Sequence, residues 1–407
     1  MNGRVVHELR ELAELTGDQS GAQRLCWTET WDVARRWLES KALELPVSVS
    51  RDEAGNQWIV LKGKSESILA IGGHLDSVSN GGWLDGSLNV VAGLDVLRSL
   101  AESEAPEVSV ALVNWADEEG ARFGRSLFGS SATTGTLDLA SLQELRDESG
   151  VRLPDALKVY GVDLERVLAS RQRLALVKGY LELHIEQGPV LESLGLPLGV
   201  VVGTFGVRRH LVRFTGQAAH AGATPMADRR DAGVAGARFS IAAREGAIRR
   251  GGVGTVGNMR VEPGMATIVP AVCEVMVDQR HLDRDELLGM LEDLRVAASL
   301  IAREERVEVD WRSVFIADPV RFDPELIAIC DEVVKDLTNA SHSMPSGPLH
   351  DATSLAAAGI PTAMIFVRSL GGLSHCKEED SLESDISISV KALHLAASRT
   401  IELISAR

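Results

Sequence analysis

The feature that most constrains the fold is an interruption in a regular alternation of strand-like and helix-like segments. Apolar runs at 67–77 and 107–116 have the length of buried strands, and the helix-like segment 88–103 lies between them. This order predicts βαβ units around a mainly parallel sheet. The alternation returns after Pro319, where 325–337 has helical periodicity. We therefore expect an α/β domain whose sequence is split in two.

The segment between Val207 and Asp318 has a different order of expected elements. A strand, a helix at 231–250, two consecutive strands, a helix at 284–304 and a final strand follow one another. The second of the two consecutive strands is expected to cover 267–281. This β-α-β-β-α-β order is that of the ferredoxin-like unit.

Together these patterns predict two domains, a number that fits a chain of 407 residues. The first is an α/β domain with a mainly parallel sheet, formed by 1–207 and 319–407. The second is a small α+β domain of 208–318 that is inserted into the first.

The composition excludes several classes of partner. Lys and Arg total 42 against 58 Asp and Glu, which gives a formal net charge of 42 − 58 = −16. Such an acidic surface repels phosphate backbones and anionic lipids, so neither nucleic-acid nor membrane binding is expected. The four cysteines lie far apart without a CxxC pair, which argues against a disulfide framework. The first 17 residues resemble an amphipathic helix without the apolar core of a signal peptide, so a cytoplasmic location is expected.

His, Asp and Glu residues concentrate in five segments, most of which follow a predicted strand. The carboxyl ends of strands are where open α/β sheets place their sites. Taken singly, such residues are usually structural histidines, solvated acidic turns or turn aspartates. As a set they supply the nitrogen and oxygen donors that Zn²⁺, Mn²⁺ and Co²⁺ prefer, and the absence of thiolates favours a catalytic site. The residues are His74, Asp76, Asp85, Asp117, Glu118, Glu119, His184, Glu186 and His375.

Six segments resemble successive signature segments of one enzyme family, in order from about residue 70 to about residue 385. They are GGHLDSVSNGGWLDG, NWADEEGARFGRSLFGS, YLELHIEQGPVLE, GQAAHAGATPMADRRDAG, SGPLHDA and MIFVRSLGGLSHCKEED. The family contains N-carbamoyl-L-amino-acid hydrolases, allantoate amidohydrolases and β-ureidopropionases, among the aminoacylase/carboxypeptidase-like dinuclear metallohydrolases.

The resemblance implies two divalent metal ions per subunit, which share the carboxylate of Asp85. It assigns His74 and His184 to one ion, and Glu119 and His375 to the other. Zn²⁺ is the expected metal, with Mn²⁺, Co²⁺ or Ni²⁺ as alternatives.

Two further acidic residues receive catalytic roles from the same resemblance. Asp76 matches the carboxylate that orients the His74 ring. Glu118 matches the general base, which takes a proton from the attacking water and delivers it to the leaving nitrogen.

The resemblance also implies a substrate site. His220 matches the donor that stabilises the oxyanion, and Arg280 matches the arginine that grips the substrate carboxylate in bidentate geometry. His350 and Gln187 match substrate-contacting positions, and Thr267 stands where the family usually has asparagine. Because His220 and Arg280 lie in the inserted domain, that domain is expected to act as a lid. The resemblance also implies a homodimer formed through this domain, and it allows one of these residues to come from the partner chain.

A few departures bear on specificity without affecting an expected metal ligand. Besides Thr267, Arg368 replaces a usual proline and Cys376-Lys377 replaces a residue followed by proline. The predicted function is metal-dependent hydrolysis of a linear amide or ureido C–N bond, with an N-carbamoyl-L-amino acid as the expected substrate. Two alternatives remain at this point: an N-acyl amino acid deacylase or dipeptidase with the same metals, and an inactive module that binds carboxylate ligands.

Overall fold

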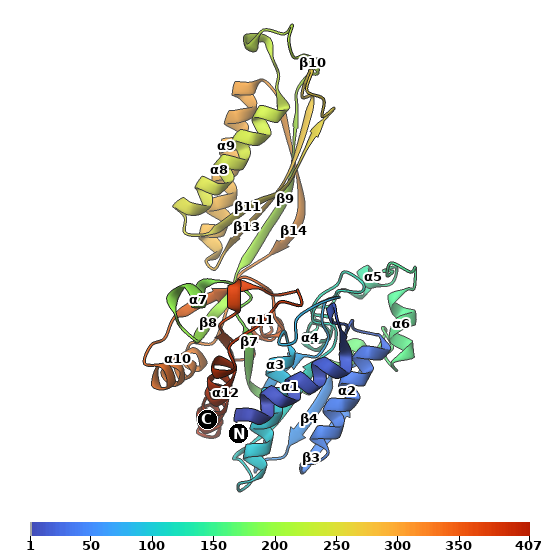
Figure 1. The fold of residues 1–407 in the computed structure, drawn as a ribbon, viewed down its shortest axis with the longest axis vertical. Helices are drawn as coiled ribbons and strands as arrows, with labels where there is room; N and C mark the ends of the chain where they lie inside the picture. The colour runs from blue at the N-terminus through green and yellow to red at the C-terminus, as the bar shows by residue number, and fades with distance from the viewer. Residues whose placement is uncertain (1) are drawn as a thin grey trace. The chain divides into compact units, whose positions relative to one another are not determined.

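The computed structural model describes residues 2–407, which form two compact units (Figure 1). The larger unit comprises the chain up to Val202 together with Phe322–Arg407, and the smaller unit comprises Gly203–Arg321. Met1, which was included in the predicted N-terminal helix, lies outside the described residues.

A nine-stranded mixed sheet organises the larger unit. Its strands follow the order β15-β8-β17-β7-β5-β6-β4-β3, and β16 pairs with β8. The four central strands β17, β7, β5 and β6 run parallel, whereas the outer strands pair antiparallel. The α/β fold with a parallel sheet centre is therefore confirmed. The bounds are β3 (Val47–Arg51), β4 (Gln57–Leu61), β5 (Ser65–His74), β6 (Val108–Trp115), β7 (Val177–Ile185), β8 (Leu198–Thr204), β15 (Val320–Arg321), β16 (Ser343–Ser346) and β17 (Thr362–Val367).

Both faces of the central strands are buried, which explains why these strands are continuous apolar runs rather than alternating ones. In β6, Val110 and Leu112 belong to one core cluster, and Ala111 and Val113 belong to another on the opposite face. Helices α1, α2, α3, α10 and α12 contribute to the first cluster, and α7 and α11 contribute to the second. The helix bounds in this unit are α1 (Asn2–Thr16), α2 (Glu29–Ala42), α3 (Ser87–Ala101), α4 (Phe128–Thr134), α5 (Leu139–Leu142), α6 (Leu153–Val159), α7 (Val190–Leu194), α10 (Pro324–Thr338), α11 (Asp351–Ala357) and α12 (Glu383–Ser405).

The smaller unit has the predicted β-α-β-β-α-β order. Its antiparallel sheet has the strand order β11-β13-β9-β14, which is the ferredoxin-like arrangement, and α8 and α9 pack on one face. The opposite face is polar and carries charged side chains such as Arg209, Asp278 and Arg280. The bounds are β9 (Gly206–Thr215), α8 (Ala232–Arg249), β11 (Val253–Glu262), β13 (Val272–His281), α9 (Arg284–Glu305) and β14 (Glu308–Ala317).

One predicted strand of this unit was wrong in its extent. The run expected as a single strand over 267–281 is divided into β12 (Ile268–Val269) and β13, with a break at Pro270. Proline has no N–H to donate to a ladder, so the chain turns there. β12 pairs instead with β10 (Ala219–His220) at the end of the sheet where β13 begins (Figure 1).

The smaller unit is inserted between two neighbouring positions of the larger one. The N–H of Phe322 donates a hydrogen bond to the carbonyl of Val202, and Val320 pairs with Thr204 across β15 and β8. The chain therefore leaves and returns at adjacent residues. None of the helices between residues 2 and 407 combines the length and apolar character needed to cross a bilayer.

Candidate metal centre

Five segments of the larger unit converge where the parallel strands end. His74 is the last residue of β5, Glu118 and Glu119 follow β6, and His184 lies near the end of β7. Asp85 precedes α3, and His375 lies in the loop after β17. Parallel strands bring their carboxyl ends to one edge of a sheet, which explains this convergence of segments far apart in the sequence.

Close backbone approach is needed to bring Asp85 to His74. Gly86 has a φ of +63°, and a Cβ at this position would lie 2.4 Å from the His74 ring. Only glycine therefore allows the turn that presents Asp85 beside the ring.

Asp85 lies at the centre of the cluster and directs its two oxygens to different groups. Its Oδ1 is 3.5 Å from Nε2 of His74 and 3.2 Å from Nε2 of His184. Its Oδ2 is 3.4 Å from Nε2 of His375, which is itself 3.3 Å from Oε2 of Glu119. Two three-residue donor sets therefore share one carboxylate, and the ligand atoms of each set lie within 4.8 Å of one another.

Glu118 also lies within reach of a cation. Its Oε2 is 3.8 Å from Nε2 of His74, and His74, Glu118 and Glu119 form a third group with donor atoms within 4.8 Å. The geometry therefore allows either a ligand role or a proton-transfer role for this carboxylate.

The electrostatics of the cluster fit bound cations. Burial, followed by the charge of Asp85, raises the pKa of Glu119 to about 7. Burial and the nearby carboxylates of Glu119, Asp351 and Asp76 likewise raise the pKa of Glu118 well above its usual range, although His74 opposes this. Oε1 of Glu119 is buried without a hydrogen-bond partner. Buried carboxylates that repel one another in this way are a suitable donor set for divalent cations.

The imidazoles show the complementary effect. Burial alone would lower the pKa of His74, but the carboxylates of Glu118, Asp85 and Asp76 raise it well above its ordinary value. For Asp85, burial would raise the pKa, but hydrogen bonds to the three surrounding imidazoles hold it well below its usual range. The imidazoles and carboxylates of the cluster thus stabilise each other's charged forms.

Asp76 contacts the cluster in two ways. Nδ1 of His74 lies 2.9 Å from the backbone carbonyl oxygen of Asp76, and 3.8 Å from its carboxylate Oδ1. The carboxylate accepts hydrogen bonds from the backbone N–H groups of Glu118, at 3.3 Å, and Glu119, at 3.1 Å. Asp76 therefore fixes the turn that carries both glutamates as well as the His74 ring.

Gln187 and His350, the predicted substrate contacts of the larger unit, also lie at this centre. Nε2 of Gln187 donates a hydrogen bond to Oδ2 of Asp85 at 2.9 Å. The His350 ring lies 4.4 Å from the His184 ring between centroids, and its Nε2 is buried without a partner. Burial, followed by the charge of His184, lowers the pKa of His350 well below its ordinary value.

The predicted residues of the smaller unit fall into two groups. His220 and Thr267 lie together, since the carbonyl of Thr267 accepts a hydrogen bond from Ala221 at 2.9 Å. Nδ1 of His220 accepts from the N–H groups of Gly222 and Ala223, both at 3.1 Å, which places the ring proton on Nε2. His220 is thus a hydrogen-bond donor through Nε2.

Arg280 lies at the other end of the sheet. Its Nε donates to Oδ1 of Asp278 at 2.8 Å, and Arg209 donates to the other oxygen of the same carboxylate at 2.8 Å. Arg280 lies eight positions along β13 from Val272, next to which β12 and His220 lie. At about 3.3 Å per residue this separation is about 26 Å. The structure therefore does not bring His220 and Arg280 of one chain together.

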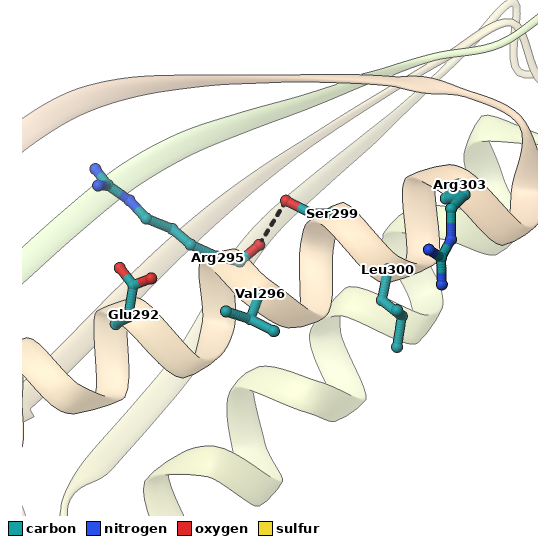
Figure 2. A pocket seen from close by; sticks show the side chains of 6 residues that line it. All are labelled: Glu292, Arg295, Val296, Ser299, Leu300 and Arg303. Carbon is teal, nitrogen blue, oxygen red and sulfur yellow. Dashed lines mark hydrogen bonds between the residues drawn. The ribbon is translucent and has the colours of Figure 1, made fainter.

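Figure 2 shows a surface pocket of the smaller unit that has a different character. A single helix, α9, forms it, and the hydroxyl of Ser299 donates to the carbonyl of Arg295 at 2.9 Å. Two guanidiniums, one carboxylate and the exposed Val296 and Leu300 line it. In the described part of the chain, every cluster of three or more metal-type donors lies in the larger unit.

The sequence analysis missed several buried polar residues around the centre. Glu182 accepts from the hydroxyl of Tyr180 at 2.8 Å, and both carboxylate oxygens of Asp351 are buried without a hydrogen-bond partner. Glu379 accepts from the backbone of Asp85 at 2.9 Å. The odd position of a glutamate inside the apolar strand β7 was a signal for Glu182, whereas no local pattern distinguishes Glu379 from its acidic neighbours.

Comparisons with known proteins agree with this geometry. Residues 70–399 match the model described as peptidase family M20/M25/M40. The chain is 36% identical over 400 residues to the N-carbamoyl-L-amino acid amidohydrolase of Geobacillus stearothermophilus, with 96% of each chain covered. It is 33% identical to the allantoate amidohydrolase of Escherichia coli, with 92% of each covered. The crystal structure of an amidase of the hydantoinase/carbamoylase family from Burkholderia multivorans matches with a TM-score of 0.90 at 31% identity, over 97% of each chain.

The fold and these matches define a hydrolase that acts on carbon–nitrogen bonds other than peptide bonds. The chain belongs to peptidase family M20/M25/M40, in its carbamoylase and allantoate amidohydrolase group. The predicted family resemblance is therefore confirmed.

Proposed function

We propose that the chain hydrolyses an N-carbamoyl-L-amino acid to the free amino acid, ammonia and carbon dioxide, with two divalent cations. The observation that carries this proposal is the pair of donor sets that share Asp85. His74 and His184 would complete one set, and Glu119 and His375 the other. Zn²⁺ is the proposed metal, and the mixed nitrogen and oxygen donors also suit Mn²⁺, Co²⁺ or Ni²⁺.

The cations would supply Lewis-acid polarisation of the ureido carbonyl and a water of lowered pKa. The chain's own contribution begins with Glu118, which takes the proton of the attacking water and delivers it to the leaving nitrogen. Burial of Glu118 raises the pKa of its carboxyl, which suits a group that must both accept and release a proton. Asp76 holds the backbone of Glu118 in place.

The substrate's two ends would be bound by residues of the smaller unit. His220 donates from Nε2 to the oxyanion that develops on the carbonyl, and Arg280 pairs with the α-carboxylate. Asp278 holds Nε of Arg280, which orients the guanidinium. Gln187 and His350 are proposed to contact the ureido group, and Thr267 lies beside His220 where it would shape specificity.

The distance between His220 and Arg280 supports a homodimer in which one site uses residues of both chains. A carbamoyl amino acid is far shorter than the separation of about 26 Å along β13. The exposed apolar side chains Ile241 and Ile248 on α8, and Val296 and Leu300 on α9, suit a contact between smaller units. Domain closure would then assemble the site around the substrate. A cytoplasmic location stays a prediction.

A substrate panel tests the proposed function. The chelated enzyme would be reloaded with Zn²⁺, Mn²⁺ or Co²⁺ and incubated with N-carbamoyl-L-amino acids, allantoate, N-acetyl amino acids and dipeptides. Ammonia release from carbamoyl substrates supports the proposal. Acetate release or dipeptide cleavage with no ammonia would favour the deacylase or dipeptidase alternative. Binding without any turnover would favour the inactive carboxylate-binding alternative.

A further inference from the structure

A buried carboxylate outside the proposed ligand set joins two loops of the metal centre. Glu379 is 1% exposed, and its Oε1 accepts hydrogen bonds from the backbone N–H groups of Leu84, at 3.1 Å, and Asp85, at 2.9 Å. Its Oε2 accepts from the hydroxyl of Ser374 at 2.9 Å. Ser374 directly precedes His375, so one side chain fastens the loop of Asp85 to the loop of His375, across 294 residues of sequence.

The hydroxyl of Ser374 extends this connection to the carboxylate of Asp85. Its Oγ lies 3.0 Å from Oδ2 of Asp85, which is the oxygen that faces His375. Nε2 of Gln187 donates to the same oxygen and lies 3.1 Å from the Ser374 hydroxyl. A hydroxyl has one proton, so Ser374 donates either to Asp85 or to Glu379 at any moment. If Asp85 held a cation through Oδ2, Glu379 would remain as the acceptor for that proton.

Gly82 lacks a side chain and therefore leaves space for this carboxylate. A Cβ at that position would lie 2.1 Å from both Cδ and Oε1 of Glu379. Any larger residue would therefore displace the carboxylate from the Leu84 and Asp85 amides. Contact with Glu379 thus explains why the second residue of the GG pair in NGGWLDG is glycine, which the metal ligands alone do not explain.

The other donor set shares Asp85 but depends less on this connection. His74 and His184 lie on strands β5 and β7, whose positions are fixed by the ladder of the central sheet. The set of Asp85 Oδ2, Glu119 and His375 instead takes all three of its members from loops. Loops need such outside partners to keep a fixed geometry.

We propose that Glu379 is a positioning residue for the second cation, the one expected between Asp85, Glu119 and His375. This inference rests on the proposed two-metal function. Hydrogen-bond partners behind metal ligands typically contribute about 10- to 100-fold to metal affinity. Removal of Glu379 should therefore weaken the second cation by about this factor and leave the first cation bound.

The test measures Zn²⁺ affinity and stoichiometry by titration of the metal-free protein, for the wild type and three variants. Glu379→Ala should bind the second ion about 10- to 100-fold more weakly. The first ion should be weakened less, because His74 and His184 are held on strands. Glu379→Gln should be closer to the wild type, because its amide oxygen can still accept from the two backbone N–H groups and its NH₂ can donate to Ser374. The adjacent exposed residue provides the matched control, and Glu378→Ala should leave both affinities unchanged.

A fourth variant keeps the test decisive if Glu379→Ala does not fold. Ser374→Ala removes only the hydroxyl and should weaken the second ion in the same direction. Two equally tight ions in Glu379→Ala, or equal weakening of both ions, would overturn the proposal. If the wild type itself binds fewer than two ions, the proposed function fails, and that result is distinct from a failure of the role of Glu379.

Discussion

The separation of His220 from Arg280 leads to a complementation experiment. The two residues lie at opposite ends of β13, about 26 Å apart along the strand, so one chain cannot direct both to one small substrate. If the proposed homodimer forms, we expect His220→Ala and Arg280→Ala each to inactivate it, but to rescue each other in a mixed dimer. Loss of an oxyanion donor typically costs about 10² to 10³ in kcat, so the single variants give a low background.

The expected recovery follows from the symmetry of a dimer. If each site takes His220 from one chain and Arg280 from the other, a mixed dimer has one site with both native residues and one site with neither. The mixed dimer should therefore have about half the activity of the wild-type dimer. An equal mixture that reassorts freely should reach about a quarter, since about half of its dimers are mixed.

Co-expression with two different affinity tags would isolate the mixed dimer for the assay. Activity that stays at the level of the single variants would show that both residues act within one chain, and failure to isolate any mixed dimer would refute the dimer itself. Pairing each variant with Glu118→Gln would then show which residue crosses, because only the residue donated by the partner can be rescued.

Three further perturbations have defined expectations. Glu118→Gln should lower kcat by about 10² to 10⁴ while two metal ions stay bound. It should also raise the melting temperature of the metal-free protein, because a buried repulsive charge is removed. Loss of an ion, measured by elemental analysis, would instead indicate that Glu118 is a metal ligand. Chelation should abolish turnover and lower the melting temperature, with recovery on addition of Zn²⁺, and a chelator-resistant rate would contradict the metal mechanism. Burial, then Arg295 and Arg208, lower the pKa of His210 below its ordinary 6.5. The unfolded chain therefore binds more protons below that pH, and the stability of the smaller unit should fall as the pH drops from about 7 to about 5. His210→Gln should flatten this dependence in urea unfolding, and an unchanged slope would exclude His210 as its source.

Local sequence patterns were sufficient to predict helices and strands and the edge of the sheet at which the site lies. Apolar runs located β5 and β6, and the order of elements predicted the ferredoxin-like unit. The candidate ligands His74 and His184 were recognisable because they lie at strand ends, whereas Asp85 and His375 were recognised in the signature segments. The structure brings all four together. Their roles as ligands stay a prediction.

Contacts between distant segments were not predictable in the same way. The hydrogen bonds of Glu379 to Leu84 and Asp85 form because two loops lie close together in the fold. Neither loop has a periodic sequence pattern from which this contact could be predicted. The same holds for the Asp76 carboxylate, which reaches the backbone of Glu118 and Glu119 from the next strand. The break between β12 and β13 at Pro270 could have been predicted, because a proline in the sequence has no N–H to donate to a strand ladder.

The insertion point has a practical consequence for protein engineering. Because the Phe322 amide already meets the Val202 carbonyl, a tight turn could replace all of 203–321 without stretching the backbone. Such a shortened polypeptide would retain every proposed metal ligand and lose His220 and Arg280. It would allow cation uptake to be studied apart from recognition of the amino acid. It would also offer a scaffold on which a foreign module could be grafted to confer a new selectivity.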